Sequence, residues 1–403
     1  MSARRLLVLT TSYPLTPQSC SGIFVRRMIE HLPRDLHITV VAPAARTDAV
    51  PSDRSNIVVR PFRYAPKPMQ VLAHEPGGIP VALRSRRWTR VLLPAFLLSM
   101  LVSCFRHARR ADVIHANWSI CGCVAGVVGI VWRIPVITTL HGEDVTRARH
   151  RALDRAVLSL CLKLSDRVVA VSPAIESWLR ERYPGLAHKI QTVGNGIEDE
   201  LLALPLDRPD ATASGRLRLL TVGSLIPRKG INRIIEAIGH LPNPRRVRLT
   251  VAGSGPELAA LEQLVETLRL GDDIEFVGAV EPRMVVDLLA KADAFVLASH
   301  SEGRPSVVLE AMAAALPVIA TDIDGVRDIV EHESTGLLYD GDDTFQLAGH
   351  ISRLCESGEL RRRLGATARR RIVQWGLLWD NTSQQYASLY RALSVETGAK
   401  KKA

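Results

Sequence analysis

The sequence predicts an α/β protein built from two doubly wound parallel sheets, and three observations indicate this class. The chain has 403 residues, more than a single hydrophobic core usually serves, so two domains are expected. Apolar residues make up 47% of the chain, enough for two cores. Short apolar runs alternate with amphipathic segments of helix length, and this series occurs twice.

The first series fills the N-terminal half. Its apolar runs contain few polar residues, as expected for strands of a parallel sheet that helices cover on both faces. The predicted strands are Leu6–Leu9, Ile38–Val41, Val113–His115, Val136–Thr139 and Arg167–Val171, and the helices between them include Ile23–Leu32 and Ala152–Leu164.

The second series begins after residue 215 and has the same rhythm. A last amphipathic segment, Leu377–Leu393, is predicted as a closing helix. The predicted strands are Leu217–Val222, Arg248–Ala252, Glu275–Val277, Ala294–Leu297 and Pro317–Ala320, and the helices are Ile231–Gly239, Pro256–Leu268, Pro282–Ala290 and Ser306–Ala315.

We therefore expect a domain over residues 1–197, a linker over 198–214 that contains Pro205 and Pro209, and a second domain over 215–375. Residues 376–403 are expected to hold the closing helix and a basic, disordered tail, Lys400–Lys402. Ligands of doubly wound folds bind beyond the carboxyl ends of the strands, here in a cleft between the two sheets.

The chain is basic, with 52 Lys and Arg against 41 Asp and Glu and a net charge of +11. This charge indicates either an ordinary soluble surface or attraction to anionic partners such as nucleoside diphosphates and lipid head groups. Nucleic acid is not an expected partner, because no zinc-ligand spacing or aromatic-interleaved basic stretch is present. The scattered cysteines fit a reducing, cytoplasmic setting, and we assign Cys121 and Cys123 to the core.

Two apolar stretches, Val91–Phe105 and Trp118–Trp132, are shorter than a membrane span, so the chain is not expected to cross a bilayer. The run Leu6–Leu9 is likewise too short for a signal peptide. Arginines flank the first stretch within residues 84–110. This pattern is typical of a helix on anionic lipid, or of a helix packed on its domain with cationic ends. We favour the packed helix and keep the membrane surface as a candidate partner.

One segment has the composition of a diphosphate site. The predicted strand Leu217–Val222 leads to Gly223, and Arg228 and Lys229 follow just before the next predicted helix. A helix N-terminus offers free backbone N–H groups, and two adjacent cations add charge for phosphate oxygens. The alternative is a solvated loop with ordinary Lys and Arg.

A pair of glutamates marks the second candidate segment. Glu302 follows the predicted strand Ala294–Leu297, and Glu310 lies about one turn into the next helix, with seven residues between them. One carboxylate could bind sugar hydroxyls while the other binds a ribose diol. Two surface glutamates near a helix start remain the alternative, because the helix dipole favours them.

Together with other short motifs, these segments resemble glycosyltransferase family 4. The motifs occur in the family's order over nearly the whole chain, and the ordered set is more specific than any one of them. They are Gly22, Asp112-Val-Ile-His115, His141-Gly142, Asn195-Gly196-Ile197, Val222-Gly223, Arg228-Lys229-Gly230, Val251-Ala-Gly253-Ser-Gly255-Pro256, Phe276-Val-Gly278, the Glu302/Glu310 pair with Ala311-Met312-Ala313, and Pro317-Val-Ile-Ala-Thr-Asp322 with Gly325-Val326.

The resemblance implies a GT-B fold, in which two Rossmann-like doubly wound domains face each other across a cleft. It also implies hexosyl transfer from a nucleotide-sugar with retention of anomeric configuration. The catalytic residues it implies are His141, Arg228, Lys229 and Glu302, and the donor-binding residues are Gly22, Gly223, Arg228, Lys229, Gly278, Glu302, Gly303, Arg304, Pro305, Ser306 and Glu310.

Individual roles follow from the same resemblance. Arg228 and Lys229 should bind the diphosphate, Glu310 the ribose, and Glu302 the transferred sugar. His141 should face the donor sugar and the departing phosphate, unless it is a buried, paired core histidine. Gly22 should let the first helix approach the phosphates with no side chain in the way.

The chain departs from the family pattern in its loops. Ser21-Gly22 and Asp324-Gly325 replace glycine pairs, and Asp328 stands where glutamate is common. Asp322-Ile-Asp324 has the Asp-x-Asp spacing of some metal sites, but it lies in the family's ordinary loop context. We therefore expect neither a metal nor a bound cofactor.

Two other function classes remain for comparison. A dinucleotide-dependent oxidoreductase is disfavoured, because Thr11-Ser-Tyr-Pro14 stands where a Gly-x-Gly-x-x-Gly turn would follow the first strand. A scaffold protein that kept the fold without the chemistry is the alternative function. The expected donor is UDP- or GDP-linked, and the acceptor is a glycan, lipid-linked or small molecule. The expected location is cytoplasmic, with peripheral contact at the cytoplasmic face of the membrane.

Overall fold

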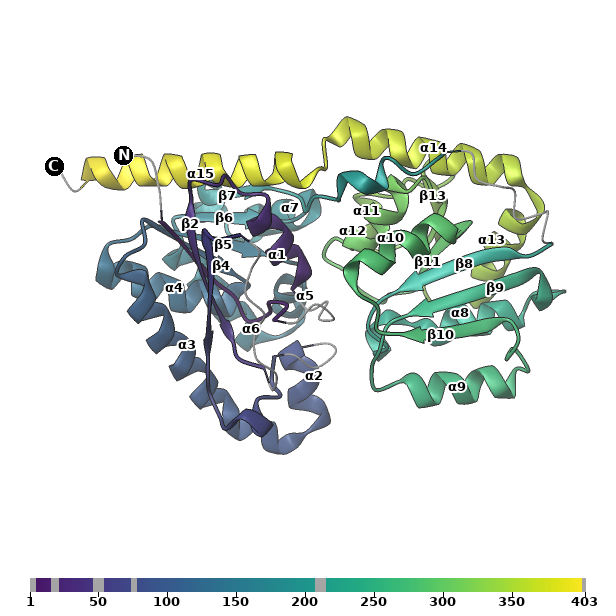
Figure 1. The fold of residues 1–403 in the computed structure, drawn as a ribbon, viewed down its shortest axis with the longest axis horizontal. Helices are drawn as coiled ribbons and strands as arrows, with labels where there is room; N and C mark the ends of the chain where they lie inside the picture. The colour runs from purple at the N-terminus through teal and green to yellow at the C-terminus, as the bar shows by residue number, and fades with distance from the viewer. Residues whose placement is uncertain (1–4, 16–21, 46–53, 74–77, 207–214, 401–403) are drawn as a thin grey trace. The chain divides into compact units, whose positions relative to one another are not determined.

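The computed structural model describes residues 5–15, 22–45, 54–73, 78–206 and 215–400 (Figure 1). The chain forms two compact units. The N-unit comprises Met1–Gly196 together with Trp379–Ala403, and the C-unit comprises Ile197–Leu378. The expected boundaries, after residues 197 and 375, lie within a few residues of these divisions. Of the predicted linker, residues 207–214 lie outside the described residues, and the described part, 198–206, belongs to the C-unit rather than standing between the units. Residues 401–403, which include most of the predicted tail, also lie outside the described residues.

The N-unit contains a seven-stranded parallel sheet in the order β3-β2-β1-β4-β5-β6-β7. Its strands are β1 (Arg5–Leu9), β2 (His37–Pro43), β3 (Ile57–Phe62), β4 (Val113–Asn117), β5 (Val136–Leu140), β6 (Arg167–Ala170) and β7 (Ile190–Thr192). Its helices are α1 (Ile23–Glu30), α2 (Gly78–Ser85), α3 (Leu92–Ala108), α4 (Ser119–Trp132), α5 (Glu143–His150), α6 (Ala152–Leu164), α7 (Pro173–Arg182) and α15 (Trp379–Lys400).

The C-unit contains a six-stranded parallel sheet in the order β10-β9-β8-β11-β12-β13. Its strands are β8 (Leu217–Val222), β9 (Val247–Ala252), β10 (Ile274–Gly278), β11 (Ala294–Leu297), β12 (Val318–Thr321) and β13 (Gly336–Tyr339). Its helices are α8 (Ile231–Gly239), α9 (Leu258–Thr267), α10 (Pro282–Lys291), α11 (Ser306–Ala313), α12 (Asp324–Arg327), α13 (Thr344–Glu356) and α14 (Gly358–Trp375).

The central strands are mostly apolar and buried, as expected where helices cover both faces of a sheet. On β1, Leu6 and Val8 pack in the cluster that contains α1 and α15, whereas Leu7 and Leu9 pack with α3 and α4. The side-chain period of two therefore sends neighbouring residues into different cores. The expected α/β class with two doubly wound sheets is confirmed.

The strand order places a topological switch point in each sheet. In the N-unit the order reverses between β1 and β4, and in the C-unit it reverses between β8 and β11. Loops leave the sheet in opposite directions at such a point, so ligands bind there beyond the carboxyl ends of the strands. The segments that follow β8 and β11 are those predicted to bind the diphosphate and the sugar.

Helix α15 completes the core of the N-unit, although it comes from the far end of the chain. It begins at Trp379, two residues later than predicted, and extends to Lys400. Trp379, Tyr386 and Tyr390 are buried against α1 and the sheet. The Tyr390 hydroxyl lies 2.8 Å from Nδ1 of the buried His115.

The expectation about apolar helix length is wrong. A 3-10 turn, Arg87–Val91, continues directly into α3, so Arg87–Ala108 is long and apolar enough by length and composition to cross a membrane. The run is longer than Val91–Phe105 because helical geometry continues through the flanking arginine segment. One face of α3 packs in the N-unit core. The absence of a membrane crossing stays a prediction.

We predict that Tyr390→Ala lowers the free energy of unfolding by about 3–5 kcal/mol, because it leaves a cavity beneath α15. Tyr390→Phe is the matched control, since it removes only the hydroxyl next to His115 and should cost about 1 kcal/mol. Urea unfolding monitored by circular dichroism measures both. Equal losses for the two variants would contradict the packing of α15 in this core.

Candidate functional site

The C-unit site centres on an ion pair between the loops that follow β8 and β11. The chain leaves β8 at Val222 and forms a 3-10 turn, Pro227–Lys229, before α8 begins. Nζ of Lys229 lies 2.6 Å from Oε1 of Glu302, which follows β11. The two side chains are 16% and 9% exposed. Because β8 and β11 are neighbours in the sheet, residues 73 positions apart in sequence meet at its switch point.

Arg228 adds a second cation to this pair. One of its guanidinium nitrogens lies 3.5 Å from Oε2 of Glu302, and the same group donates to the Ser301 carbonyl oxygen at 2.9 Å. Burial acts to raise the pKa of Glu302, but Lys229 and Arg228 together outweigh it and hold the pKa below its usual value. Glu302 is therefore ionised at neutral pH. Two cations face one carboxylate, and this group favours an additional anion.

A buried arginine supports the loop that carries this pair. The backbone N–H of His300 donates to the Arg228 carbonyl oxygen at 2.8 Å. Arg233 on α8 is buried and lies 3.0 Å from Nδ1 of His300, and it also pairs with Asp342. The loop that carries Glu302 is thus tied to α8 through His300 and to the Lys229 loop through the Arg228 carbonyl. Sequence reasoning missed Arg233 and His300, because an arginine within an apolar helix does not reveal its tertiary partner.

The remaining donor-site candidates of the second segment lie at the start of α11. Pro305 is the N-cap residue and Ser306 begins the helix, one turn before the buried Glu310. Gly303 and Arg304 connect them to Glu302. Burial lowers the pKa of Arg304, and the charge of Asp328 partly offsets that effect. The structure thus places Glu302 and Glu310 on one loop-to-helix segment, as predicted.

Gly223, which follows β8, and Gly278, which ends β10, lie at the same edge of the sheet. The Lys229 side chain passes Gly223, with its Cε 3.6 Å from where a Cβ on that glycine would lie. Gly278 ends β10, and its carbonyl oxygen accepts the Gly253 N–H at 2.7 Å. Glycine at these positions keeps backbone exposed at the strand ends, where a ligand can approach it.

In the sequence Asp324-Gly325, which departs from the family pattern, the glycine occupies the position that requires it. A Cβ on Gly325 would lie 2.3 Å from the Glu302 carbonyl oxygen, so only glycine allows α12 to pack against the Glu302 loop. Its neighbour Asp324, which replaces a glycine in the pattern, has a side chain that is 55% exposed. The substitution therefore affects the outer side of the turn, and the inner packing is retained.

In the N-unit, His141 follows β5 and lies in an aromatic pocket at the end of the sheet. Its Nε2 is 2.9 Å from Oδ1 of Asn117, the last residue of β4. The rings of Phe24 and Trp118 pack on the imidazole, with centroids 4.6 and 4.8 Å away. Burial, with a smaller effect from His115, lowers the pKa of His141 to about 3. The imidazole is therefore neutral at physiological pH.

The hydrogen bond to Asn117 also fixes the tautomer of His141. An amide oxygen can only accept, so Nε2 carries the proton and Nδ1 is left as an acceptor. Nδ1 is buried and has no hydrogen-bond partner among the described residues. The interpretation of His141 as a paired core histidine fits Nε2 but leaves Nδ1 unexplained. Asn117 was missed in the sequence, although a polar residue ending an apolar strand was a usable signal.

Gly22 lies at the same edge of the N-unit, two residues before Phe24. Its φ of 73° is in the left-handed region, and it is the N-cap of α1. A Cβ there would lie 2.2 Å from the Ser12 carbonyl oxygen. The loop after β1 therefore requires glycine for its own packing, a reason that the sequence did not suggest. Its predicted approach to phosphates stays a prediction.

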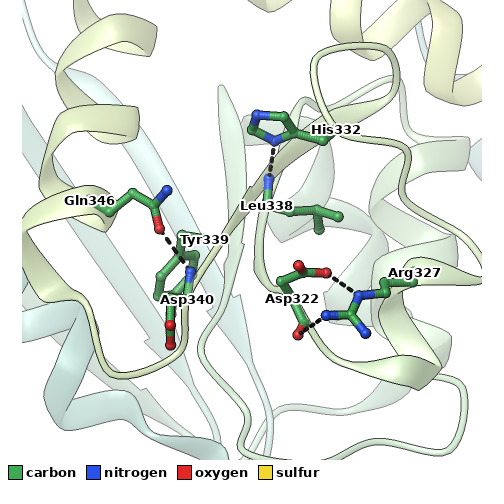
Figure 2. A pocket seen from close by; sticks show the side chains of 7 residues that line it. All are labelled: Asp322, Arg327, His332, Leu338, Tyr339, Asp340 and Gln346. Atoms are coloured by element: carbon green, nitrogen blue, oxygen red, sulfur yellow. Dashed lines mark hydrogen bonds and ion pairs between the residues drawn. The ribbon is translucent and has the colours of Figure 1, made fainter.

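A separate hollow of about 500 Å³ lies beside β12 and β13, and Figure 2 shows its lining. Arg327 points to Asp322 and forms an ion pair with it at 2.5 Å, so the first aspartate of the Asp-x-Asp sequence already has a cationic partner. Nδ1 of His332 accepts the Leu338 N–H at 2.9 Å. None of the predicted site residues lines this hollow, which is lined by Asp322, Arg327, His332, Leu338, Tyr339, Asp340 and Gln346.

Comparisons with known proteins agree with this arrangement. The family described as glycosyl transferases group 1 matches residues 206–371, and the one described as Glycosyltransferase Family 4 matches residues 21–201. A glycogen synthase of Mycobacterium tuberculosis is 30% identical over 70% of this chain and 70% of its own length. The chain belongs to the group 1 glycosyltransferases of family 4.

Solved structures support the fold of this glycosyltransferase. Sucrose-phosphate synthase from Thermosynechococcus elongatus has a TM-score of 0.78 at 24% identity, covering 98% of this chain and 100% of that one. The Anabaena protein HepE in complex with UDP has a TM-score of 0.73 at 19% identity, covering 96% and 99%. The predicted GT-B fold of two Rossmann-like domains is confirmed. The group 1 match includes the Lys229–Glu302 pair.

We predict that Lys229→Met lowers the free energy of unfolding by about 3 kcal/mol at pH 7, because a buried carboxylate loses its nearest cation. The lowered pKa of Glu302 means that the pair stabilises the fold above the carboxyl's ordinary pKa of about 4.3, and that this contribution is lost as pH falls. The loss in the variant should therefore be smaller near pH 4. Denaturant titration at both pH values measures it.

The control for this prediction is Lys229→Met/Glu302→Gln, which removes both charges and should recover most of the stability. An equal loss at both pH values, with no recovery in the double variant, would show that packing rather than charge explains the effect of Lys229.

Proposed function

We propose that this protein is a retaining, metal-independent glycosyltransferase. It transfers a hexosyl group from a nucleoside-diphosphate-sugar to a hydroxyl of a glycan, lipid-linked or small-molecule acceptor. The observation that carries the proposal is the Lys229–Glu302 pair with Arg228 beside it, at the β8/β11 switch point. A diphosphate supplies the anion that this excess of positive charge favours, and it binds Lys229 and Arg228 in this proposal.

The chemistry follows from where charge develops. As the bond between the sugar C1 and the phosphate oxygen breaks, negative charge accumulates on the leaving nucleoside diphosphate. Lys229 and Arg228 stabilise that charge in a partly buried site, where electrostatic interactions are stronger than in water. The acceptor oxygen bonds to C1 on the same face, and its proton passes to the departing phosphate oxygen. The products are the glycoside and the nucleoside diphosphate.

Other residues position the donor in this proposal. Glu310 accepts from the ribose hydroxyls, and Glu302 holds the transferred sugar rather than attacking it. The unpartnered Nδ1 of His141 accepts a hydrogen bond from a donor-sugar hydroxyl, a role that its neutral, buried state supports. Gly22 brings the N-terminus of α1 to the phosphates. The positive charge that other transferases take from a metal comes here from Arg228 and Lys229.

The base and the acceptor are narrower proposals. Uridine is favoured over guanosine, because a solved structural relative binds UDP. We favour a lipid-linked or polysaccharide acceptor, made at the cytoplasmic face of a membrane that the protein contacts peripherally. The alternative is a small soluble acceptor. Relatives named for glycogen and for sucrose phosphate support both acceptor classes.

Thermal unfolding in the presence of UDP, GDP and ADP tests donor binding. A nucleotide at a hundred times its dissociation constant should add about 2.7 kcal/mol to the free energy of unfolding. Glu310→Ala and Lys229→Ala should lose this shift relative to their own baselines. Arg248→Ala removes an exposed cation on β9 and serves as the control. No shift with any nucleotide on folded protein would favour the scaffold alternative.

The anomeric configuration of the product tests the retaining mechanism. Once the thermal shift has named the nucleotide, the product formed from an α-linked donor sugar should be α-linked, because attack occurs on the face that the phosphate leaves. Proton NMR of the anomeric position reports this directly. A β-linked first product would rule out same-face attack and leave donor binding intact.

A further inference from the structure

The N-unit exposes an apolar face that neither the fold nor the donor site uses. We define the α3–α4 face as Val91, Leu98, Val102 and Phe105 on α3 and its preceding turn, with Val127, Ile130 and Val131 on α4. These side chains are between 40% and 80% exposed. Single exposed apolar residues are ordinary, but this set follows the exposed sides of two adjacent helices.

The sequence spacing explains why α3 has two apolar sides. Phe96, Met100, Cys104 and Ala108 recur every four residues and are fully buried against the sheet. Val91, Leu98, Val102 and Phe105 recur at spacings of seven, four and three and lie on the opposite side. A soluble surface helix normally carries polar residues on that second side.

The two helices form one continuous face at their C-terminal ends. The ring of Phe105 lies 5.0 Å from the ring of Trp132, the last residue of α4. The Trp132 indole N–H also donates to the Phe105 carbonyl oxygen at 3.2 Å. Trp88, before α3, is exposed as well, so an indole lies near each end of the face. Indole rings are enriched at the interface between membrane and water.

Arginines surround this face and carboxylates are almost absent from it. Between residues 86 and 133 the only acidic residue is Asp112, whose carboxylate accepts the Arg5 N–H at 3.0 Å. None of the arginines of this segment forms an ion pair with a carboxylate among the described residues. They are Arg86, Arg87, Arg90, Arg106, Arg109, Arg110 and Arg133, all exposed.

We propose that the α3–α4 face docks on an anionic lipid bilayer. The apolar side chains enter the boundary between head groups and acyl chains, and the flanking arginines bind lipid phosphates. Arg109 lies 6.0 Å from the Trp132 ring centroid, which places its charge at the rim of the apolar surface. The interaction belongs to the N-unit and does not require the donor chemistry, so each can fail without the other.

Two other occupants of this face fit less well. Crossing the bilayer would pull Phe96, Met100 and Cys104 out of the N-unit core, because α3 cannot span a membrane while that side packs on the sheet. A second copy of the chain would place arginines opposite arginines around a two-fold axis, with few carboxylates to compensate. An anionic bilayer offers an apolar interior to the exposed side chains of this face and phosphate groups to the flanking arginines.

Co-sedimentation of the full-length protein with vesicles tests the proposal. The wild type should bind vesicles of mixed phosphatidylglycerol and phosphatidylcholine, and should bind pure phosphatidylcholine much less. Arg106→Glu/Arg109→Glu should weaken binding by at least about tenfold, since each basic residue near an anionic membrane contributes about 1 kcal/mol. Leu98→Glu/Val102→Glu should also weaken it, because two apolar side chains no longer enter the boundary between head groups and acyl chains. Raising the salt concentration should weaken the wild type's binding further.

Matched controls keep the test specific. Val373→Glu/Val395→Glu introduces the same two charges at comparably exposed apolar positions on α14 and α15, and Arg362→Glu/Arg370→Glu reverses two exposed arginines on α14. Both should bind vesicles as the wild type does, and thermal unfolding should show that all variants are folded. The proposal is overturned if the wild type ignores anionic vesicles, or if the α3 variants bind as tightly as the controls. A wild-type dimer that Leu98→Glu converts to monomer would assign the face to self-association instead.

Discussion

The carboxylate of Glu302 is buried at the end of a parallel sheet, and the charge of Lys229 keeps it ionised there. Three features of the C-unit position this ion pair. The strand order brings the two loops together, Arg233 contacts the His300 side chain two residues before Glu302, and Gly325 lets α12 pack against the Glu302 carbonyl. Because Arg228 adds a second cation, the site is arranged for an anion. In our proposal the diphosphate binds where Lys229 and Arg228 already supply more positive charge than Glu302 neutralises.

In the N-unit, the corresponding edge of the sheet, at the carboxyl ends of the strands, holds His141 rather than an ion pair. His141 must remain neutral to accept a hydrogen bond through Nδ1, and burial among Phe24 and Trp118 ensures this. Asn117 fixes the proton on Nε2. Behind them, the Tyr390 hydroxyl of α15 contacts His115 on β4, and the Tyr386 hydroxyl contacts Thr139 on β5. The last helix of the chain thereby packs against β4 and β5, the strands that position Asn117 and His141, although it lies more than 200 residues away in the sequence.

Much of this arrangement could be predicted from the sequence, because apolar strands and strand-end loops leave a local signature. Strands such as Leu217–Val222 and helices such as Ile231–Gly239 have the predicted bounds. The loop that carries Glu302 and its relation to Glu310 follow from the same signature. The partners of Arg233 and the orientation of His141 do not, because they depend on contacts between distant segments. The sequence also could not indicate which side of α3 is exposed, because apolar residues lie on both sides of the helix.

The decisive experiment for the diphosphate site is a crystal structure of the protein with the nucleoside diphosphate that the thermal shift selects. The account predicts that the phosphate oxygens contact Lys229 and Arg228 at the β8/β11 switch point, and that the ribose contacts Glu310. The Lys229–Glu302 distance should then exceed the 2.6 Å described above, because Lys229 turns to the phosphates. A nucleotide bound elsewhere, or a Lys229–Glu302 pair unchanged beside a bound diphosphate, would contradict the claim that this pair is the diphosphate site.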